Sequence, residues 1–161
     1  MSQKVSLKHI RECDMRLLSY RAKCGDAFHL QYEGESGKRR NIFLDMGHTK
    51  TYTQFLKGVI SNIVGASEQI DALFLSHIHD DHIGGASRFI NDIQKDSALG
   101  NVVIRWIYNA PRKYDVEETD DKKAGVLCGI VSGDKVYEHI LSHRPTDLGD
   151  VLEGMSFNID G

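Results

Sequence analysis

The 161-residue sequence has no apolar run near the roughly 18 residues of a membrane span, and its N-terminus lacks the apolar stretch of a secretory signal. Its three cysteines are widely spaced, odd in number and without a Cys-x-x-Cys pair. This pattern excludes a zinc ribbon and a disulfide scaffold, and it favours reduced thiols. We therefore expect a soluble, cytoplasmic protein without a membrane partner.

A strong excess of charge of one sign is also missing. The formal net charge is −3, which gives no general attraction to nucleic acids or anionic membranes. The one basic run, Lys38-Arg39-Arg40, follows a Gly-containing segment and is typical of a solvated hairpin tip. With 40% hydrophobic and 27% charged residues, the chain is expected to form one globular domain over residues 1–161.

Hydrophobic periodicity predicts a sheet with helices packed on it. The first three strands are separated by glycine-containing loops, which suggests an antiparallel meander. Helical spacing is clearest from Tyr52 to Ile63, and Gly65 is a plausible stop. Strands are expected at 15–22, 27–32, 41–45, 72–75 and 102–108, helices at 52–63, 87–93 and 134–142, a polar loop at 111–123, and strand fragments in the tail at 151–152 and 157–159.

The most informative segment follows the apolar run Ala72–Leu75. It places three imidazoles and a carboxylate within six positions, at His77, His79, Asp81 and His82. Imidazole suits borderline-soft divalent metals, and a carboxylate suits a second, harder position. An extended exit from the strand puts His77 and His79 on one side, and a turn brings His82 back to them. The segment is predicted to be a metal site.

With strand, metal motif and helix in this order, the chain resembles the metallo-β-lactamase-fold superfamily of metallohydrolases. His77-x-His79-x-Asp81-His82 matches the principal ligand motif of that superfamily. Leu44-Asp45-Met46-Gly47 matches its upstream aspartate–glycine turn, whose carboxylate lies near the metals. The segments Cys24–Phe28 and Ile83–Ala86 look most like the branch of the DNA-uptake competence proteins. The resemblance implies an α/β fold, an αββα sandwich of which this chain would be the N-terminal half.

The family's later half supplies a bridging aspartate and a last histidine, and the sequence has no such pair at a suitable place. His139 and His143 have i, i+4 spacing and are interpreted either as an exposed helix face or as a replacement ligand pair. We expect the site to be completed by a C-terminal half or by a partner subunit.

The resemblance further implies a hydrolase with two divalent ions per complete site, zinc foremost, with manganese and iron also suitable. His77, His79 and His82 would hold the first ion, and Asp81 would hold the second and orient or deprotonate a water, which becomes a metal-bound hydroxide. Asp45 would receive an imidazole N–H and fix which ring nitrogen faces the metal. Gly84 and Gly85 are expected to turn the backbone sharply beside the metals, with a helix beginning there.

Phosphodiester bonds are the expected substrate, with a nucleic acid as candidate, which requires basic residues at the rim such as Arg88, Arg105, Arg112 and Lys113. One alternative is a carboxylic or thioester hydrolase of the same fold. Another is a non-catalytic split or regulatory subunit with an incomplete site.

Overall fold

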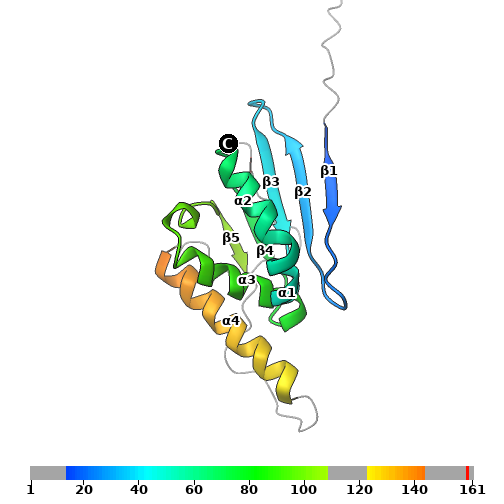
Figure 1. Cartoon of the computed structure of the whole chain (residues 1–161), viewed down its shortest axis with the longest axis vertical. Coiled ribbons are helices and arrows are strands. Elements are labelled where there is room, and N and C mark those ends of the chain that lie inside the picture. Colours follow the sequence, from blue (N-terminus) through cyan, green and yellow to red (C-terminus); the bar gives the residue numbers. More distant parts are fainter. Residues whose placement is uncertain (1–13, 109–122, 144–158, 160–161) are drawn as a thin grey trace, which may run out of the picture.

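The computed structural model describes residues 14–108, 123–143 and 159. Its five strands form one sheet, and the helices lie on one side of it (Figure 1). The strands are β1 Arg16–Ser19, β2 Phe28–Glu33, β3 Arg39–Leu44, β4 Ala72–Leu75 and β5 Trp106–Tyr108. The helical elements are α1 Thr49–Thr51, a π-helical turn η1 Tyr52–Leu56, α2 Lys57–Gly65, α3 Asp80–Ile93, a 3₁₀ turn η2 Ser97–Leu99 and α4 Lys123–His143.

The sheet has the order β1-β2-β3-β4-β5, and the strand pairing changes from antiparallel to parallel at β3. Strands β1 to β3 pair antiparallel, so the predicted meander is confirmed. Strands β3, β4 and β5 are parallel, and helices provide the two crossovers between them, as parallel pairing requires. The carboxyl ends of β3, β4 and β5 therefore meet at one edge of the sheet, where α/β proteins commonly place their ligands.

The hydrophobic core lies between the sheet and the helices. One row of paired residues crosses four strands, His29, Phe43, Leu73 and Trp106, and each is at most 2% exposed. Helix residues such as Leu56, Ile60, Phe89 and Ile90 belong to the same core cluster. The mixed α/β fold class predicted from the sequence is confirmed.

The other side of the sheet is also apolar but less covered. Leu17 is 69% and Leu44 43% exposed, and Ile42 and Phe74 are partly buried. Side chains alternate between the two sides of a strand, so these residues point away from the helices. The second sheet of the expected sandwich is not found among residues 14–108 and 123–143.

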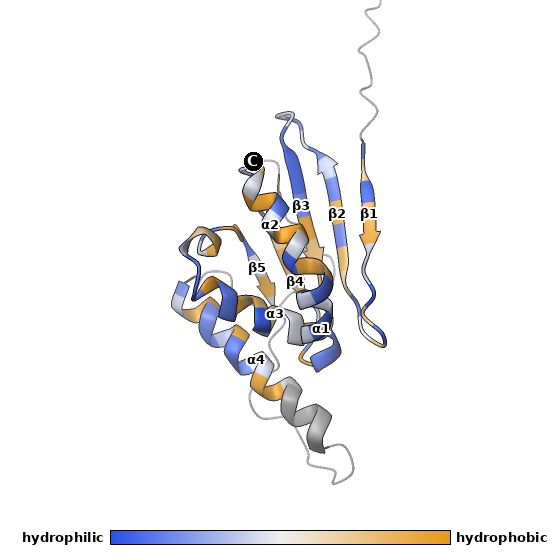
Figure 2. Cartoon of the chain, in the orientation of Figure 1, coloured by the Kyte–Doolittle hydropathy of each residue, from blue (hydrophilic) through white to orange (hydrophobic). Residues whose placement is uncertain are grey.

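The basic run lies at the hairpin between β2 and β3, as predicted. The hairpin is closed by the Gly34 N–H, which donates to the Lys38 carbonyl at 2.8 Å. Figure 2 shows hydrophilic residues at this end of the two strands and hydrophobic ones toward the other end. Because Arg39 begins β3, the run is at the far end of that strand from its carboxyl edge.

Helix α3 begins at Asp80, seven residues before the expected start at Ser87. Asp80 and Asp81 occupy its first turn, where carboxylates interact favourably with the helix dipole. Gly84 and Gly85 are therefore helical, and the expectation that they turn the backbone was wrong. A Cβ on Gly85 would lie 2.2 Å from the Met46 carbonyl oxygen, and the Gly85 N–H donates to the Gly47 carbonyl at 2.7 Å. Glycine here lets α3 contact the turn after β3.

Helix α4 also begins earlier than expected, at Lys123 instead of Asp134. Gly129 and Gly133 made the sequence look non-helical, yet both lie at close contacts. A Cβ on Gly129 would meet the Ile78 carbonyl oxygen at 2.4 Å, and one on Gly133 would meet the Tyr108 hydroxyl at 2.8 Å. Tertiary packing therefore outweighs the weak helix propensity of these glycines.

The strand expected at 102–108 is shorter, because only Trp106–Tyr108 pairs with β4. Val103 instead makes an isolated bridge to Ile70 before the chain continues into β5. Strand β1 is likewise shorter than expected, while β4 agrees residue for residue. The loop at 111–122 and the strand fragments at 151–152 and 157–158 lie outside the described residues.

None of the helices described here combines the length and the apolar character that crossing a membrane requires.

Replacing Gly85 with Ala should destabilise the fold, because the added Cβ would overlap the Met46 carbonyl. We expect the free energy of unfolding to fall by about 2 kcal/mol or more in urea titrations. Gly58 is the matched control, since it is exposed in α2 and a Cβ there meets no atom of the described residues within 4 Å. Gly58→Ala should stabilise the chain by up to about 1 kcal/mol. Equal effects of the two substitutions would contradict the close contact.

His139 should make stability fall in acid. Burial, and secondarily His143, lower its pKa from 6.5 to about 4, and its Nδ1 is buried with no hydrogen-bond partner among the described residues. Above pH 6.5 the ring is neutral in both states; below it, only the unfolded chain takes up a proton, so stability decreases as the pH falls toward 4. The loss at pH 5 should be about 2 kcal/mol. In urea titrations, the stability of His139→Phe should not show this loss between pH 6.5 and 5. His143→Gln, which changes an exposed residue, should show most of it.

Candidate metal centre

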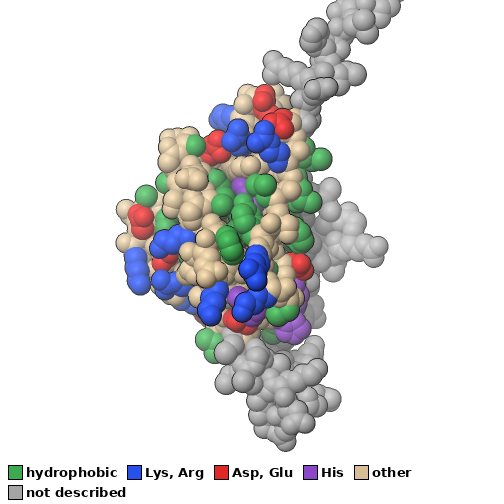
Figure 3. Space-filling model, turned by 45° about the vertical axis from the view of Figure 1, so that its right-hand side comes forward, with side chains coloured by type: hydrophobic (Ala, Val, Ile, Leu, Met, Phe, Trp, Pro, Cys, Tyr) green, Lys and Arg blue, Asp and Glu red, His purple; other side chains and the backbone are tan. Residues whose placement is uncertain are grey.

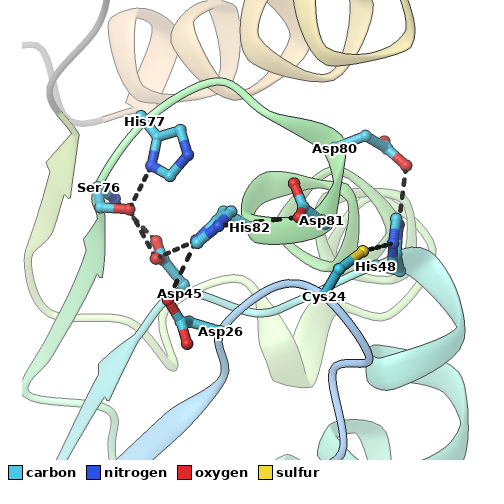
Figure 4. Close-up of polar contacts among 9 residues, drawn as sticks. All are labelled: Cys24, Asp26, Asp45, His48, Ser76, His77, Asp80, Asp81 and His82. Atoms are coloured by element: carbon cyan, nitrogen blue, oxygen red, sulfur yellow. Dashed lines mark hydrogen bonds and ion pairs between the residues drawn. The ribbon is translucent and has the colours of Figure 1, made fainter. Parts of the chain in front are cut away.

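The candidate metal centre lies at the carboxyl edge of β3 and β4. Asp45 directly follows β3, His77 follows β4 after Ser76, and His82 is in the first turn of α3. Backbone hydrogen bonds join these segments, since the Asp45 N–H donates to the Phe74 carbonyl at 2.8 Å and the Met46 N–H to the His82 carbonyl at 3.0 Å. Parallel pairing and these contacts bring residues 45 and 77–82 together (Figure 4).

The three motif histidines lie side by side. The ring centroid of His77 is 4.0 Å from that of His82 and 4.8 Å from that of His79. Burial, and the neighbouring rings of His82 and His79, lower the pKa of His77 below its ordinary value. Neutral imidazole is the form that binds a metal. The structure thus brings the rings of His77, His79 and His82 together, and their role as ligands stays a prediction.

Asp45 holds this cluster by three hydrogen bonds. Its Oδ1 accepts from the Ser76 backbone N–H at 2.8 Å. Its Oδ2 accepts from the Ser76 hydroxyl at 2.6 Å and lies 2.8 Å from His82 Nδ1. The residue is only 2% exposed and has a φ of 55°, a left-handed conformation that aspartate tolerates better than most residues. The contact between Asp45 and an imidazole is the one expected from the sequence.

Ser76 links Asp45 to a second imidazole through hydrogen bonds. Its Oγ lies 2.8 Å from His77 Nδ1. Since the single hydroxyl hydrogen goes to Asp45, this oxygen can only accept, and His77 Nδ1 must carry the donating proton. His82 Nδ1 likewise donates to the carboxylate. In the neutral form of each ring, Nε2 is therefore the nitrogen without a hydrogen, and it is the one that can bind a metal.

Asp81 lies on the open side of His82. Its Oδ2 is 4.0 Å from His82 Nε2, the nitrogen opposite the one held by Asp45. Asp26 approaches the other side of the ring, with Oδ2 3.8 Å from Nδ1. Asp81 is thus near the free imidazole nitrogen, as a second metal ligand would need to be.

Within the described part of the chain, one group has at least three potential donor atoms within 4.8 Å of one another: Asp45, His77 and His82. Two imidazoles and a carboxylate suit a divalent ion such as zinc. Because the oxygens of Asp45 already accept three hydrogen bonds, we interpret it as a positioning group and the imidazoles as ligands. His79 and Asp81 lie outside this closely spaced group.

Sequence reasoning missed Ser76, although its place directly before His77 was a usable signal. It also missed a hydrogen-bonded chain of Cys24, His48 and Asp80 beside the centre, visible in Figure 4. These residues are far apart in the sequence, so only the fold reveals their contact.

The other candidate residues contribute little here. Arg88 contacts Asp92 at 3.7 Å, Arg105 is exposed, and Arg112 and Lys113 lie outside the described residues. The interpretation of His139 as part of an exposed helix face was wrong, because it is 7% exposed and packs against Trp106 with a centroid distance of 5.2 Å.

Comparison with known proteins identifies one family. The family model described as the metallo-beta-lactamase superfamily matches residues 34–154, which is more than half of the chain. No curated protein matches, and no solved structure matches.

Asp45→Asn should weaken metal binding while preserving shape, because asparagine also tolerates the left-handed backbone. The loss of a charged acceptor for His82 and Ser76 should reduce Zn²⁺ affinity by about 10- to 100-fold in competition with a chromophoric chelator. Ser76→Ala, which affects the His77 side alone, should cause a smaller loss. Asp26→Asn is the control for a nearby carboxylate and should leave the affinity within about threefold. Unchanged affinity in Asp45→Asn would contradict the positioning role.

Proposed function

The chain belongs to the metallo-beta-lactamase superfamily, whose members are generally metal-dependent hydrolases, and from this premise we propose that it hydrolyses phosphodiester bonds. The observation that carries the proposal is the set of contacts from His77 through Ser76 and Asp45 to His82, two rings whose centroids are 4.0 Å apart. These contacts engage Nδ1 of both rings, so Nε2 of each ring is the candidate ligand atom.

We assign the residues as follows. His77, His79 and His82 would hold one divalent ion, and Asp81 a second. A divalent ion supplies Lewis acidity and makes water a stronger acid. Asp45 and Ser76 keep the Nδ1 protons of His82 and His77 in place, so that both rings stay in the tautomer that binds through Nε2. Asp81 would orient the attacking water and accept its proton.

An anionic substrate is supported by exposed cations close in sequence to residues that lie beside the centre. Lys23 precedes Cys24 in the turn before β2, and Lys50 is in α1, two residues after His48; both are exposed. Figure 3 shows Lys and Arg side chains next to histidines at the lower end of one face. These cations would offset the charge of a phosphodiester, which the chain as a whole, with a formal net charge of −3, does not attract. A carboxylic ester or thioester needs no such cations.

Further ligands for the second ion would come from a segment outside the described residues or from a partner subunit. Asp81 alone is a weak site for an ion, because divalent ions in catalytic sites usually have three protein ligands. This part of the proposal is supported by the resemblance of the motif and by the position of Asp81 near His82 Nε2.

The proposed reaction can be tested with bis(p-nitrophenyl) phosphate and single-stranded DNA, in the presence of Zn²⁺ or Mn²⁺. The unaltered chain should cleave both, and His79→Ala should lose metal binding and activity together. Asp81→Asn should retain one ion but lose at least about 100-fold in rate. The matched control is Asp96→Asn, which changes an exposed aspartate beyond the other end of α3 and should keep full activity.

Full turnover by Asp81→Asn would contradict the two-ion assignment. Cleavage of p-nitrophenyl acetate or a model thioester, without cleavage of either phosphodiester, would show a carboxylic hydrolase instead. If no substrate were cleaved under any metal condition by any form of the protein, a non-catalytic subunit would be the better account.

A further inference from the structure

A second group of reactive side chains lies beside the candidate metal centre and takes no part in it. Cys24 is in the turn before β2, His48 precedes α1, and Asp80 begins α3. Cys24 Sγ is 3.8 Å from His48 Nε2, and His48 Nδ1 is 3.2 Å from Asp80 Oδ2. Figure 4 shows Cys24 and Asp80 on either end of His48, with all three on the far side of Asp81 from His77. A nucleophile, a base and a group that orients the base are therefore in contact in that order.

The order of contacts decides what this group can do. The thiol and the carboxylate contact different nitrogens of His48, so the three side chains form a relay and do not converge on one point. Within the described residues, no group of closely spaced metal donors includes them. With Nδ1 donating to Asp80, His48 Nε2 is the nitrogen that can accept the thiol proton. This is the arrangement that activates nucleophilic thiols.

Asp80 is held in place from a second direction. Its Oδ1 accepts from the Ser132 hydroxyl of α4 at 3.3 Å. Gly84 makes room for the carboxylate, because a Cβ there would lie 2.8 Å from Oδ1. A carboxylate fixed in this way can orient the His48 ring, and the ring in turn faces Cys24.

The thiol is accessible, unlike most cysteines with a purely structural role. Cys24 is exposed, and the side chains of His48 and Asp80 are 33% and 32% exposed. The turn is fixed by the Gly25 N–H, which donates to the Ala22 carbonyl at 3.2 Å, and a Cβ on Gly25 would lie 1.7 Å from the Asp81 carbonyl oxygen. The thiol thus adjoins, at a fixed place, the helix that carries two of the predicted metal ligands.

We propose that Cys24, His48 and Asp80 form a reactive thiol centre that is modified by soft electrophiles, hydrogen peroxide in particular. The thiol proton moves to His48 Nε2, and the sulfur attacks one peroxide oxygen. The S–O bond forms as the O–O bond breaks, and the departing hydroxide takes the proton from His48 to give water. Sulfur loses two electrons and peroxide gains them, which leaves a sulfenic acid on Cys24.

The test measures the alkylation rate of Cys24 by iodoacetamide at neutral pH, resolved from Cys13 and Cys128 by peptide mass spectrometry. Cys24 in the folded chain should react about tenfold faster than the same residue in the urea-unfolded chain. His48→Gln should bring the rate down to the unfolded value, and Asp80→Asn should lower it about threefold. Asp26→Asn controls for charge. It removes a carboxylate that is close in sequence to Cys24 but faces His82, and it should leave the alkylation rate unchanged.

A second measurement treats the protein with one equivalent of peroxide and traps sulfenic acid with dimedone. The adduct should form on Cys24 in the unaltered chain and be lost in His48→Gln. Equal alkylation rates in the folded and unfolded chains, or an adduct that is independent of His48, would overturn the proposal. The folded-to-unfolded comparison needs no variant, and neither measurement needs a metal or a substrate, so the outcome is independent of the hydrolase proposal.

Discussion

The buried carboxylate of Asp45 is the constraint on which the rest of the site depends. Burying a charge is costly unless hydrogen bonds compensate for it, and this one is 2% exposed. The compensation comes from the Ser76 backbone, the Ser76 hydroxyl and His82, which are the groups that link the ends of β3 and β4 to α3. One interaction therefore joins the fold to the orientation of two imidazoles.

Close backbone contacts at glycines bring the remaining pieces to this carboxylate. Gly85 lets α3 approach the turn after β3, and Gly25 lets the turn before β2 approach Asp81. The first contact positions His82 over Asp45, and the second brings Cys24 next to His48 and Asp80. The metal centre and the thiol centre are thus two consequences of the same packing at the carboxyl edge of a parallel sheet.

Much of this arrangement could be predicted from the sequence. The parts that could not be predicted depend on contacts between segments that are distant in the chain. The His77–His82 motif and β4 were predictable because ligand spacing and a short apolar run are local signals. The starts of α3 and α4 were not, because Gly84, Gly85, Gly129 and Gly133 suggest turns locally but serve contacts with distant segments. The contacts of Ser76 with Asp45 and of His48 with Asp80 join residues about 30 positions apart, so the only local signal for them was the place of Ser76 directly before His77.

The central claim is that Asp45 and Ser76 prepare His77 and His82 to bind a divalent ion. The most direct measurement is the metal content of the chain by elemental analysis, after purification without chelators, compared with a His77→Ala, His82→Ala double variant. The account predicts at least about one divalent ion per chain in the unaltered protein and almost none in the variant. No bound metal in the unaltered protein, or equal metal in both, would contradict it.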